Sequence, residues 1–265
     1  MQPLKVGLAQ GATRWHDPAG NRAYYAAMLD ALHGCDLIVL PETFTSGFSN
    51  EAIHNAETMH GPTLDWMREQ AARMGAAVAG SVQLRAAGDD VFNRLLFVTP
   101  DGNVSHYDKR HLFRYAGEHE RYCAGRDRIV VQWRGWRICP LVCYDLRFPV
   151  YSRNRHGPQG MDYDLLLYVA NWPAAREYAW HTLLRARAIE NLCYCVGLNR
   201  VGVDGNGLAY SGDSAVLDFL GRPLVELGSQ QQTVSVSLDA DALAAHRQHF
   251  PAWMDADEFR LLPQA

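Results

Sequence analysis

Long apolar runs and basic stretches are both missing from this sequence. No apolar run approaches the ~18 residues that a membrane-spanning helix needs, so we expect no transmembrane helix and no membrane partner. The formal net charge of −4 argues against a nucleic-acid partner, which would call for a basic stripe. The N-terminus leads directly into the strand-like run LKVGLAQ without a charged and then apolar segment, so we expect no secretory signal.

Recognisable metal-binding spacings are missing as well. The 11 histidines are scattered, and neither an HExxH motif nor a pair of CxxC motifs occurs, so we predict no metal and no cofactor. The six cysteines do not form the pattern of a disulfide framework. We therefore expect free thiols and a reducing, cytoplasmic location.

No linker or low-complexity segment interrupts the chain, so residues 1–265 are predicted to form one domain. A chain of this length, with 48% apolar residues, can bury an ample core. Asp17 followed by Pro18 predicts the start of a helix, and Gly75 predicts the end of another.

Short apolar runs alternate with amphipathic segments in both halves of the chain, and each half closes with hairpins. This order predicts an α/β fold of two stacked sheets with helices outside. Residues 214–220 and 233–238 are expected to pair as a hairpin around Gly221-Arg222-Pro223. The other strands are predicted at residues 4–10, 36–41, 76–84, 92–99, 104–107, 129–133, 136–142, 164–170 and 193–199, and helices at residues 17–34, 62–75, the 150s and 175–191.

Three reactive side chains follow, or nearly follow, separate strand-like runs: Glu42 in DLIVLPETF, Lys109 in YDKRHLF and Cys143 in ICPLVCYDLRFP. Residues at the carboxyl ends of strands line the functional crevice of α/β proteins. A thiol attacks only as a thiolate, so it needs a base or a nearby cation. A carboxylate with a raised pKa can take the thiol proton and later activate water. If the strand ends converge, the three groups form a site suited to attack on a carbon bound to nitrogen.

Each of these residues also has a purely structural interpretation. A free cysteine is most often a buried apolar residue, and an isolated glutamate here is more readily an ion-pair partner. An isolated lysine at a strand edge is usually solvated. The structural interpretation is preferred for four other cysteines, Cys35, Cys139, Cys193 and Cys195.

Further candidates surround these three. The backbone N–H of Tyr144 and the ammonium of Lys109 are suited to stabilising an oxyanion. Glu118 or Glu120 would orient the lysine or assist proton transfer, and the sequence does not separate the two. Asn171 and Trp172 follow the strand predicted at residues 164–170 and would shape the wall and floor of a pocket.

Arg147 lies four residues after Cys143 and has two interpretations. Its guanidinium would grip a substrate carboxylate in a forked pair. Alternatively, Asp145 or Glu190 would hold it in a structural ion pair, which is the interpretation we favour.

The segments LPETF, YDKRHLF, CYDLRFP and YVANWP together resemble the carbon–nitrogen hydrolase (nitrilase) superfamily, and the resemblance runs from Lys5 to about Glu258. In that family the corresponding residues are base, oxyanion-stabilising lysine and cysteine nucleophile, which fall here on Glu42, Lys109 and Cys143. A second glutamate is typical, and Glu118 matches it best. The resemblance implies a four-layer α-β-β-α sandwich that assembles as a homodimer or higher homo-oligomer.

Within the superfamily, RFPVYSRN, YVANWPAAREYAW, NRVGVDGNGLAYSGDS and FPAWMDADEF resemble the omega-amidase branch. This implies hydrolysis, through a thioester, of the terminal amide of 2-oxoglutaramate or 2-oxosuccinamate to the 2-oxo acid and ammonia. The partners would be a small-molecule amide and water. Arg114 and Arg147 are candidates for binding the substrate carboxylate, and Phe44 and Phe48 for lining the pocket.

Three alternatives stay open at this point. The same site would serve a nitrilase, a carbamoylase or another aliphatic amidase. The fold would also suit a non-catalytic interaction protein, which predicts an unreactive Cys143. A metal-dependent hydrolase would lose its activity with a chelator.

Overall fold

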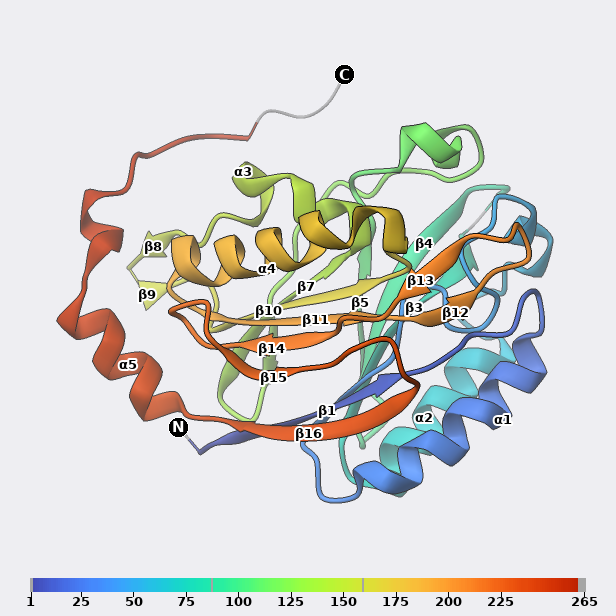
Figure 1. Cartoon of the computed structure of the whole chain (residues 1–265), viewed down its shortest axis with the longest axis horizontal. Helices are drawn as coiled ribbons and strands as arrows, with labels where there is room; N and C mark the ends of the chain where they lie inside the picture. Colours follow the sequence, from blue (N-terminus) through green and yellow to red (C-terminus); the bar gives the residue numbers. More distant parts are fainter. Residues whose placement is uncertain (1, 87, 159, 262–265) are drawn as a thin grey trace.

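The computed structural model describes residues 2–86, 88–158 and 160–261, and two six-stranded mixed sheets form its centre (Figure 1). The strand order of the first sheet is β16-β1-β2-β3-β4-β5, and that of the second is β15-β14-β11-β10-β7-β6. The first sheet consists of β1 (Leu4–Gln10), β2 (Leu37–Val39), β3 (Ala77–Arg85), β4 (Val91–Val98), β5 (Val104–Asp108) and β16 (Gln232–Leu238). The second consists of β6 (Val131–Trp133), β7 (Trp136–Val142), β10 (Leu165–Ala170), β11 (Tyr194–Asn199), β14 (Ala215–Leu217) and β15 (Pro223–Glu226).

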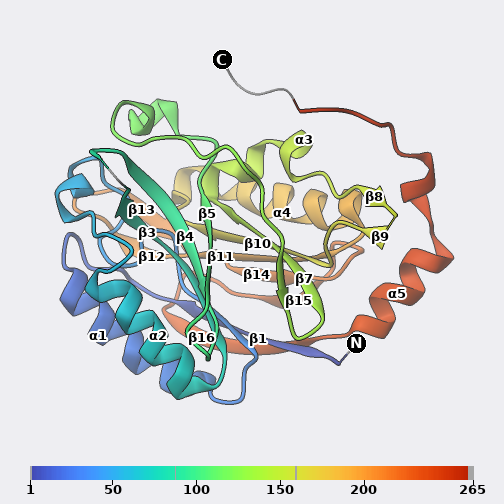
Figure 2. The same cartoon turned by 180° about the vertical axis from the view of Figure 1, so that it is seen from behind.

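Helices cover the outer face of each sheet (Figures 1 and 2). Helices α1 (Pro18–Leu29) and α2 (Pro62–Met74) lie outside the first sheet, and α4 (Glu177–Asn191) and α3 (Pro149–Ser152) lie outside the second. The predicted caps are present: the Asp17 carboxylate accepts the N–H of Gly20 at 2.9 Å, and Gly75 ends α2 with a left-handed φ of 61°. The four-layer arrangement implied by the family resemblance is therefore confirmed.

Successive residues of a strand face opposite sides of the sheet, so the buried core has two parts. In β2, Leu37 and Val39 face the second sheet, whereas Ile38 packs with the buried residues of α1 and α2. The strands β1, β2 and β3 are parallel, as are β7, β10 and β11, and their residues are almost wholly buried. The two sheets thus pack face to face, and the carboxyl ends of their parallel strands are brought together.

Strand β16 departs from the expected topology. The hairpin from β14 closes onto β15 through a turn in which Asp218 N–H donates to Arg222 O at 2.9 Å. Strand β16 instead pairs antiparallel with β1 in the first sheet, with Leu238 opposite Leu4. The prediction that residues 214–220 and 233–238 pair with each other is wrong, because the chain crosses between the sheets after β15. The Gln10 amide holds this crossing by donating to Gly228 O and Gln230 O.

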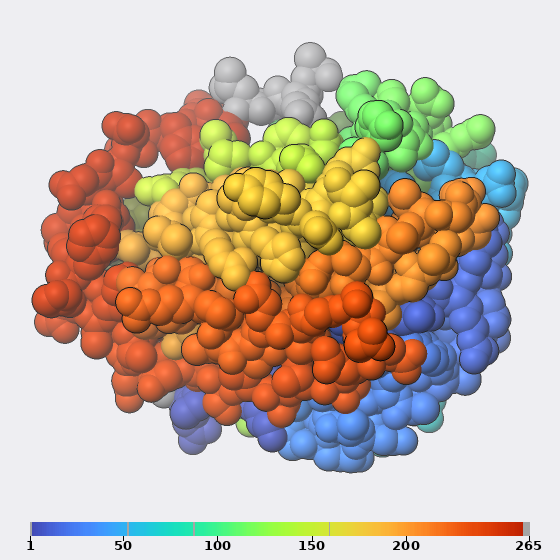
Figure 3. All heavy atoms as spheres, in the orientation of Figure 1, coloured from blue at the N-terminus to red at the C-terminus, as the bar shows by residue number. Residues whose placement is uncertain are grey.

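The remaining elements are short or peripheral. In the space-filling view, helix α5 (Ala240–His249, red) lies at one end of the molecule (Figure 3). None of the helices within the described ranges is long and apolar enough to cross a membrane. These elements are β8 (His156–Gly157), β9 (Gly160–Met161), β12 (Val201–Val203), β13 (Ala209–Ser211), α5 (Ala240–His249) and the 3₁₀ helices η1 (Asp30–Leu32), η2 (Glu51–Asn55), η3 (Arg114–Ala116), η4 (Glu118–Glu120), η5 (Cys143–Arg147), η6 (Ala174–Arg176) and η7 (Ala252–Asp255).

Candidate active site

Strand ends from both sheets meet at one place. Lys109 follows β5 directly, Cys143 follows β7, and Asn171 follows β10. Glu42 lies three residues beyond the end of β2 in the first sheet. The backbone N–H of Asn171 donates to Oε2 of Glu42 at 2.7 Å, and the Asn171 side-chain amide donates to the backbone oxygen of Glu42 at 2.7 Å. The two sheets are therefore joined by hydrogen bonds at the residues that the sequence singled out.

A buried carboxylate–ammonium–carboxylate cluster lies at this junction. The Lys109 Nζ donates to Glu42 Oε1 at 2.9 Å and to Glu118 Oε1 and Oε2 at 3.0 and 2.9 Å. The side chains of Glu42, Lys109 and Glu118 are at most 1% exposed. Burial of unpaired charges would be prohibitive, so the three ionisable groups stabilise one another. Glu120 is exposed, and Glu118 is the glutamate that contacts the lysine.

Asn93 extends the cluster and was not anticipated from the sequence. Its side-chain amide donates to Glu42 Oε1 at 2.8 Å and to Glu118 Oε1 at 3.3 Å. The hydroxyl of Ser81 donates to Asn93 Oδ1 at 2.8 Å and fixes the orientation of the amide. The signal in the sequence was a polar residue at a buried, alternating position of β4, between Val91 and Leu95.

Cys143 lies beside this cluster in an uncommon backbone conformation. Its φ is +43°, in the left-handed region, and its side chain is 9% exposed. The thiol lies 3.8 Å from the backbone oxygen of Asn171. Burial, and next the Glu42 carboxylate, raise the pKa of the Cys143 thiol well above its ordinary value, and Lys109 offsets this only in part. The raised pKa keeps the Cys143 side chain a neutral thiol, with a carboxylate beside it.

Burial and neighbouring charges also shift the pKa values of Lys109 and Glu118. Burial alone would lower the pKa of Lys109, but Glu118 and Glu42 raise it above its ordinary value. Burial raises the pKa of Glu118, Lys109 lowers it, and the neighbouring Glu42 raises it further. The lysine therefore carries a positive charge at neutral pH.

Asp145 joins the lysine segment to the cysteine segment. Its carboxylate accepts hydrogen bonds from the Tyr107 hydroxyl at 2.8 Å and from the backbone N–H of His111 at 3.0 Å. It also accepts from the backbone N–H of Val142 at 3.0 Å, directly before Cys143. The buried carboxylate thus fixes the chain on both sides of the site, and it is not a partner of Arg147.

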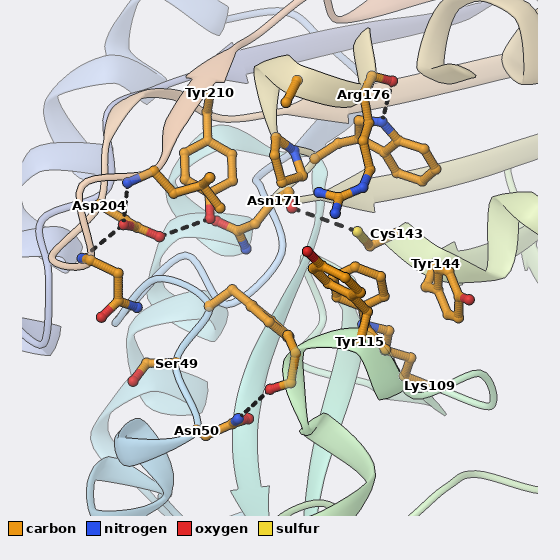
Figure 4. Close-up of a pocket in the computed structure, with 18 of the residues that line it drawn as sticks. Ser49, Asn50, Lys109, Tyr115, Cys143, Tyr144, Asn171, Arg176, Asp204 and Tyr210 are labelled. Atoms are coloured by element: carbon orange, nitrogen blue, oxygen red, sulfur yellow. Dashed lines mark hydrogen bonds between the residues drawn. The ribbon is translucent and has the colours of Figure 1, made fainter. Parts of the chain in front are cut away.

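A cavity of about 430 Å³ opens above Cys143 (Figure 4). Its walls come from the ends of both sheets, the segment 113–116 and the β12–β13 hairpin. Aromatic side chains form much of the wall, and three cations and one carboxylate line it. The charged lining residues are Lys109, Arg147, Arg176 and Asp204; the aromatic ones are Phe48, Phe113, Tyr115, Tyr144, Trp172 and Tyr210.

Most candidates from the sequence lie at this cavity. Phe48, Tyr144, Arg147, Asn171 and Trp172 all line it. The Lys109 Nζ lies 5.2 Å from the centroid of the Phe48 ring. The Arg147 guanidinium lies 4.8 Å from the centroid of the Trp172 ring, instead of pairing with either carboxylate suggested for it. The second of those carboxylates, on Glu190, pairs with Arg187 at 2.8 Å.

Two of the candidates for substrate binding, Phe44 and Arg114, do not line the cavity. Phe44 is fully buried in the core under the first sheet, where its ring contacts those of Tyr25 and Trp66. The positive φ of Thr43 turns the chain back into the protein directly after Glu42. Arg114 is exposed on η3, outside the cavity lining. The expectation that these two side chains contact substrate is therefore corrected.

The cavity also contains residues that the sequence analysis missed as a group: Arg176, Tyr115, Asp204 and Tyr210. Arg176, Asp204 and Tyr210 lie in two of the segments that resemble omega-amidases, YVANWPAAREYAW and NRVGVDGNGLAYSGDS, but the resemblance gave these residues no role. Within the described ranges, no group of three or more His, Cys, Asp or Glu side chains is placed to hold a metal ion.

Comparisons with known proteins give the family. The carbon-nitrogen hydrolase family model matches residues 5–248. Omega-amidase YafV of Escherichia coli K12 is 50% identical over 98% of this chain and 100% of its own length. The 2-oxoglutaramate amidase of Bacillus subtilis is 32% identical over 83% of this chain and 84% of its own. The solved structure of XC1258 from Xanthomonas campestris, a CN-hydrolase superfamily protein with an arsenic adduct in the active site, is 63% identical over 98% of this chain and 100% of its own, with a TM-score of 0.97.

The chain belongs to the carbon–nitrogen hydrolase family, and it is an amide-hydrolysing enzyme. The alternative of a non-catalytic interaction protein on this fold is thereby set aside.

Proposed function

We propose that the enzyme is an omega-amidase that hydrolyses the terminal amide of 2-oxoglutaramate or 2-oxosuccinamate to the 2-oxo dicarboxylate and ammonia. The observation that carries the proposal is the buried cluster of Glu42, Lys109 and Glu118 beside Cys143 at the base of the cavity. The names of the relatives support the choice of substrate. Arg147 supports it as well, because its guanidinium lines the cavity and stacks on Trp172.

The first step is attack by the Cys143 sulfur on the amide carbon. Because the thiol pKa is raised, a free thiolate is scarce, and the proton passes to Glu42 as the carbon–sulfur bond forms. The electron pair of the carbonyl moves to oxygen. The Lys109 ammonium and the Tyr144 backbone N–H bind the resulting oxyanion.

The oxyanion then re-forms the carbonyl, and the carbon–nitrogen bond breaks. The leaving nitrogen takes the proton from Glu42 and departs as ammonia, which leaves an acyl thioester on Cys143. Glu42 next removes a proton from water as the water oxygen attacks the thioester. The carbon–sulfur bond breaks, the sulfur recovers its proton, and the 2-oxo acid is released.

Glu118 has a positioning role in this scheme. An ammonium carries three N–H donors. In the resting site they are directed to Glu42 Oε1 and to both oxygens of Glu118, and we assign one of these donors to the oxyanion when it forms. With two fixed carboxylates, the lysine needs little reorganisation as charge develops on the substrate.

Three further expectations belong to the proposal. Residues 1–265 form one domain, the enzyme acts in the cytoplasm, and it assembles as a homodimer through its outer helices. Exposed apolar side chains on the outer layer of the second sheet support the last of these: Val150 on α3 and Tyr178 and Ile189 on α4 are at least 50% exposed.

A substrate panel tests the proposal. The pure enzyme should release ammonia from 2-oxoglutaramate with a larger kcat/KM than from an aliphatic nitrile, a carbamoyl amine or a neutral amide of similar length. A nitrile requires no departure of ammonia in the first step, so a nitrilase would release it only later. Preference for any other compound in the panel would discard the omega-amidase assignment and keep the hydrolase site.

A further inference from the structure

Two of the three cations in the cavity lack an acidic partner. Lys109 is compensated by Glu42 and Glu118. In contrast, the guanidinium groups of Arg147 and Arg176 make no ion pair or hydrogen bond within residues 2–86, 88–158 and 160–261. Both side chains are only half-buried at the cavity wall, so their charge acts on whatever occupies the cavity.

The carboxylate in the wall does not compensate for them. Asp204 accepts the Tyr210 hydroxyl at 2.9 Å and the backbone N–H groups of Asn206 and Leu208 at 2.8 and 3.0 Å. Its oxygens are therefore committed to the β12–β13 hairpin. Two guanidinium groups against one carboxylate give this part of the lining a net positive charge, which favours an anionic ligand.

Aromatic rings fix the position of Arg176. Its guanidinium carbon lies 5.0 Å from the centroid of the Tyr115 ring and 5.5 Å from that of Phe113. Figure 4 shows Arg176 and Tyr115 in the wall of the cavity. Such contacts use the flat face of the guanidinium and leave its N–H edges free to bind a carboxylate in a forked pair.

Trp172 connects this arginine to Arg147. Its indole N–H donates to the backbone oxygen of Arg176 at 2.8 Å, while its ring lies against the Arg147 guanidinium. One side chain therefore contacts the guanidinium of Arg147 on η5 and the backbone of Arg176 on η6.

We propose that Arg176 binds the carboxylate end of the substrate together with Arg147, and that this pair selects monoamides of dicarboxylic acids over neutral amides. The proposal rests on the proposed function and adds the residue that determines specificity. The amide lies at Cys143 at the base of the cavity, and the carboxylate lies at the arginine pair.

Steady-state kinetics of Arg176→Gln test this role. For 2-oxoglutaramate, we expect KM to rise about 10- to 100-fold, because a charge-assisted hydrogen-bonded pair is lost, with a smaller change in kcat. For a neutral amide of the same chain length, kcat/KM should stay within about twofold, because no charge is bound. Arg114→Gln is the matched control, since that arginine is exposed outside the cavity, and it should leave both substrates unchanged.

Arg176→Lys separates binding from a purely structural contact. A lysine keeps the positive charge but not the fork, so it should recover part of the lost affinity. If Arg176 only anchored the segment that carries Phe113 and Tyr115, both substrates would lose activity alike. An equal loss for both, or no change for either, would overturn the proposal.

A second measurement does not depend on turnover. Glutarate, an inert dicarboxylate, should protect Cys143 of the wild type and of Arg114→Gln from alkylation by neutral iodoacetamide. It should protect Arg176→Gln only at concentrations at least about tenfold higher. If glutarate protects Cys143 only when Arg176 is present, but the enzyme does not hydrolyse 2-oxoglutaramate, the proposed function is rejected and this inference is kept. Protection that is absent, or the same in all variants, would reject the inference even if 2-oxoglutaramate is hydrolysed.

Discussion

The backbone N–H of Asn171 donates a 2.7 Å hydrogen bond to Oε2 of Glu42, and the Asn171 side-chain amide binds the backbone oxygen of Glu42 and the Thr43 hydroxyl. The two residues follow strands of different sheets. The carboxylate proposed as the base is thus oriented by the second sheet, which also carries Cys143. Its geometry depends on how the two sheets pack together.

Asn171→Ala should separate orientation of Glu42 from its chemistry. The backbone N–H remains, but the contacts of the side chain with Glu42 O and Thr43 Oγ1 are lost. We expect kcat to fall about tenfold and the free energy of unfolding to fall by about 1–3 kcal/mol, because buried acceptors lose their donor. Kinetics and urea unfolding measure both effects. Asn206→Ala, at an exposed position of the cavity rim, should change neither, and an unchanged kcat in Asn171→Ala would contradict the role of the side chain.

Lys109→Ala should impair both activity and stability. Loss of one oxyanion donor lowers kcat by about 10²–10³. Removing one partner of a buried charge pair costs about 3–5 kcal/mol of unfolding free energy, because Glu42 and Glu118 are left uncompensated. Without Lys109, the pKa of Glu118, which burial already raises, would rise further in the folded state, so the deficit should shrink as pH falls and grow as pH rises. Chemical denaturation at several pH values measures the unfolding free energy of Lys109→Ala relative to the wild type. A difference that does not vary with pH would contradict this explanation.

Asn93→Asp tests the charge balance of the cluster without a change in shape. A third carboxylate beside Glu42 and Glu118 has no additional cation to bind, so its pKa should be raised in the folded state. Such a group stabilises the fold only when protonated, and that contribution is lost as pH rises. We expect the variant to be markedly less stable at neutral pH than at acidic pH, as followed by thermal unfolding. Asn103→Asp, which is exposed, should show no comparable pH dependence.

Buried thiols should limit stability in alkaline solution. Burial raises the pKa of Cys139 to about 12, whereas an unfolded thiol ionises near its ordinary value of about 8.5. The unfolded state therefore gains stability as pH rises above that ordinary value, by about 1.4 kcal/mol per pH unit for one thiol. Cys139→Ala removes this dependence. Its stability relative to the wild type should be constant from about pH 6 to 8 and should improve above about pH 9; parallel stability curves throughout would contradict the linkage.

The sequence predicted the order and the approximate limits of most strands and helices, but it did not predict which strand β16 pairs with. The limits of β1, β3 and β7 follow from apolar runs and turn residues, and Asp17 and Gly75 mark helix ends as predicted. The alternation of apolar and polar residues in β16 predicts a strand but does not indicate which strand it pairs with. It therefore did not reveal the pairing with β1 in the other sheet. Strand pairing between residues so distant in the chain depends on how the sheets pack.

The sequence likewise predicted part of the candidate site. Glu42, Lys109 and Cys143 were singled out because each follows a strand, and these positions converge when the sheets stack. The prediction that Arg114 binds substrate was wrong for a different reason. Arg114 and Arg176 are both arginines near motif residues, and only the course of the backbone decides which one lines the cavity. Asn93 was missed because one polar residue in a strand carries no chemical motif.

The central claim is that Cys143 and Glu42 together hydrolyse the terminal amide of 2-oxoglutaramate. The most direct test is ammonia release from this compound by the pure wild type and by Cys143→Ala, with circular dichroism to show that the variant is folded. The account predicts rapid release by the wild type and none above background by the folded variant. Release by the variant at a rate comparable to that of the wild type would contradict the claim.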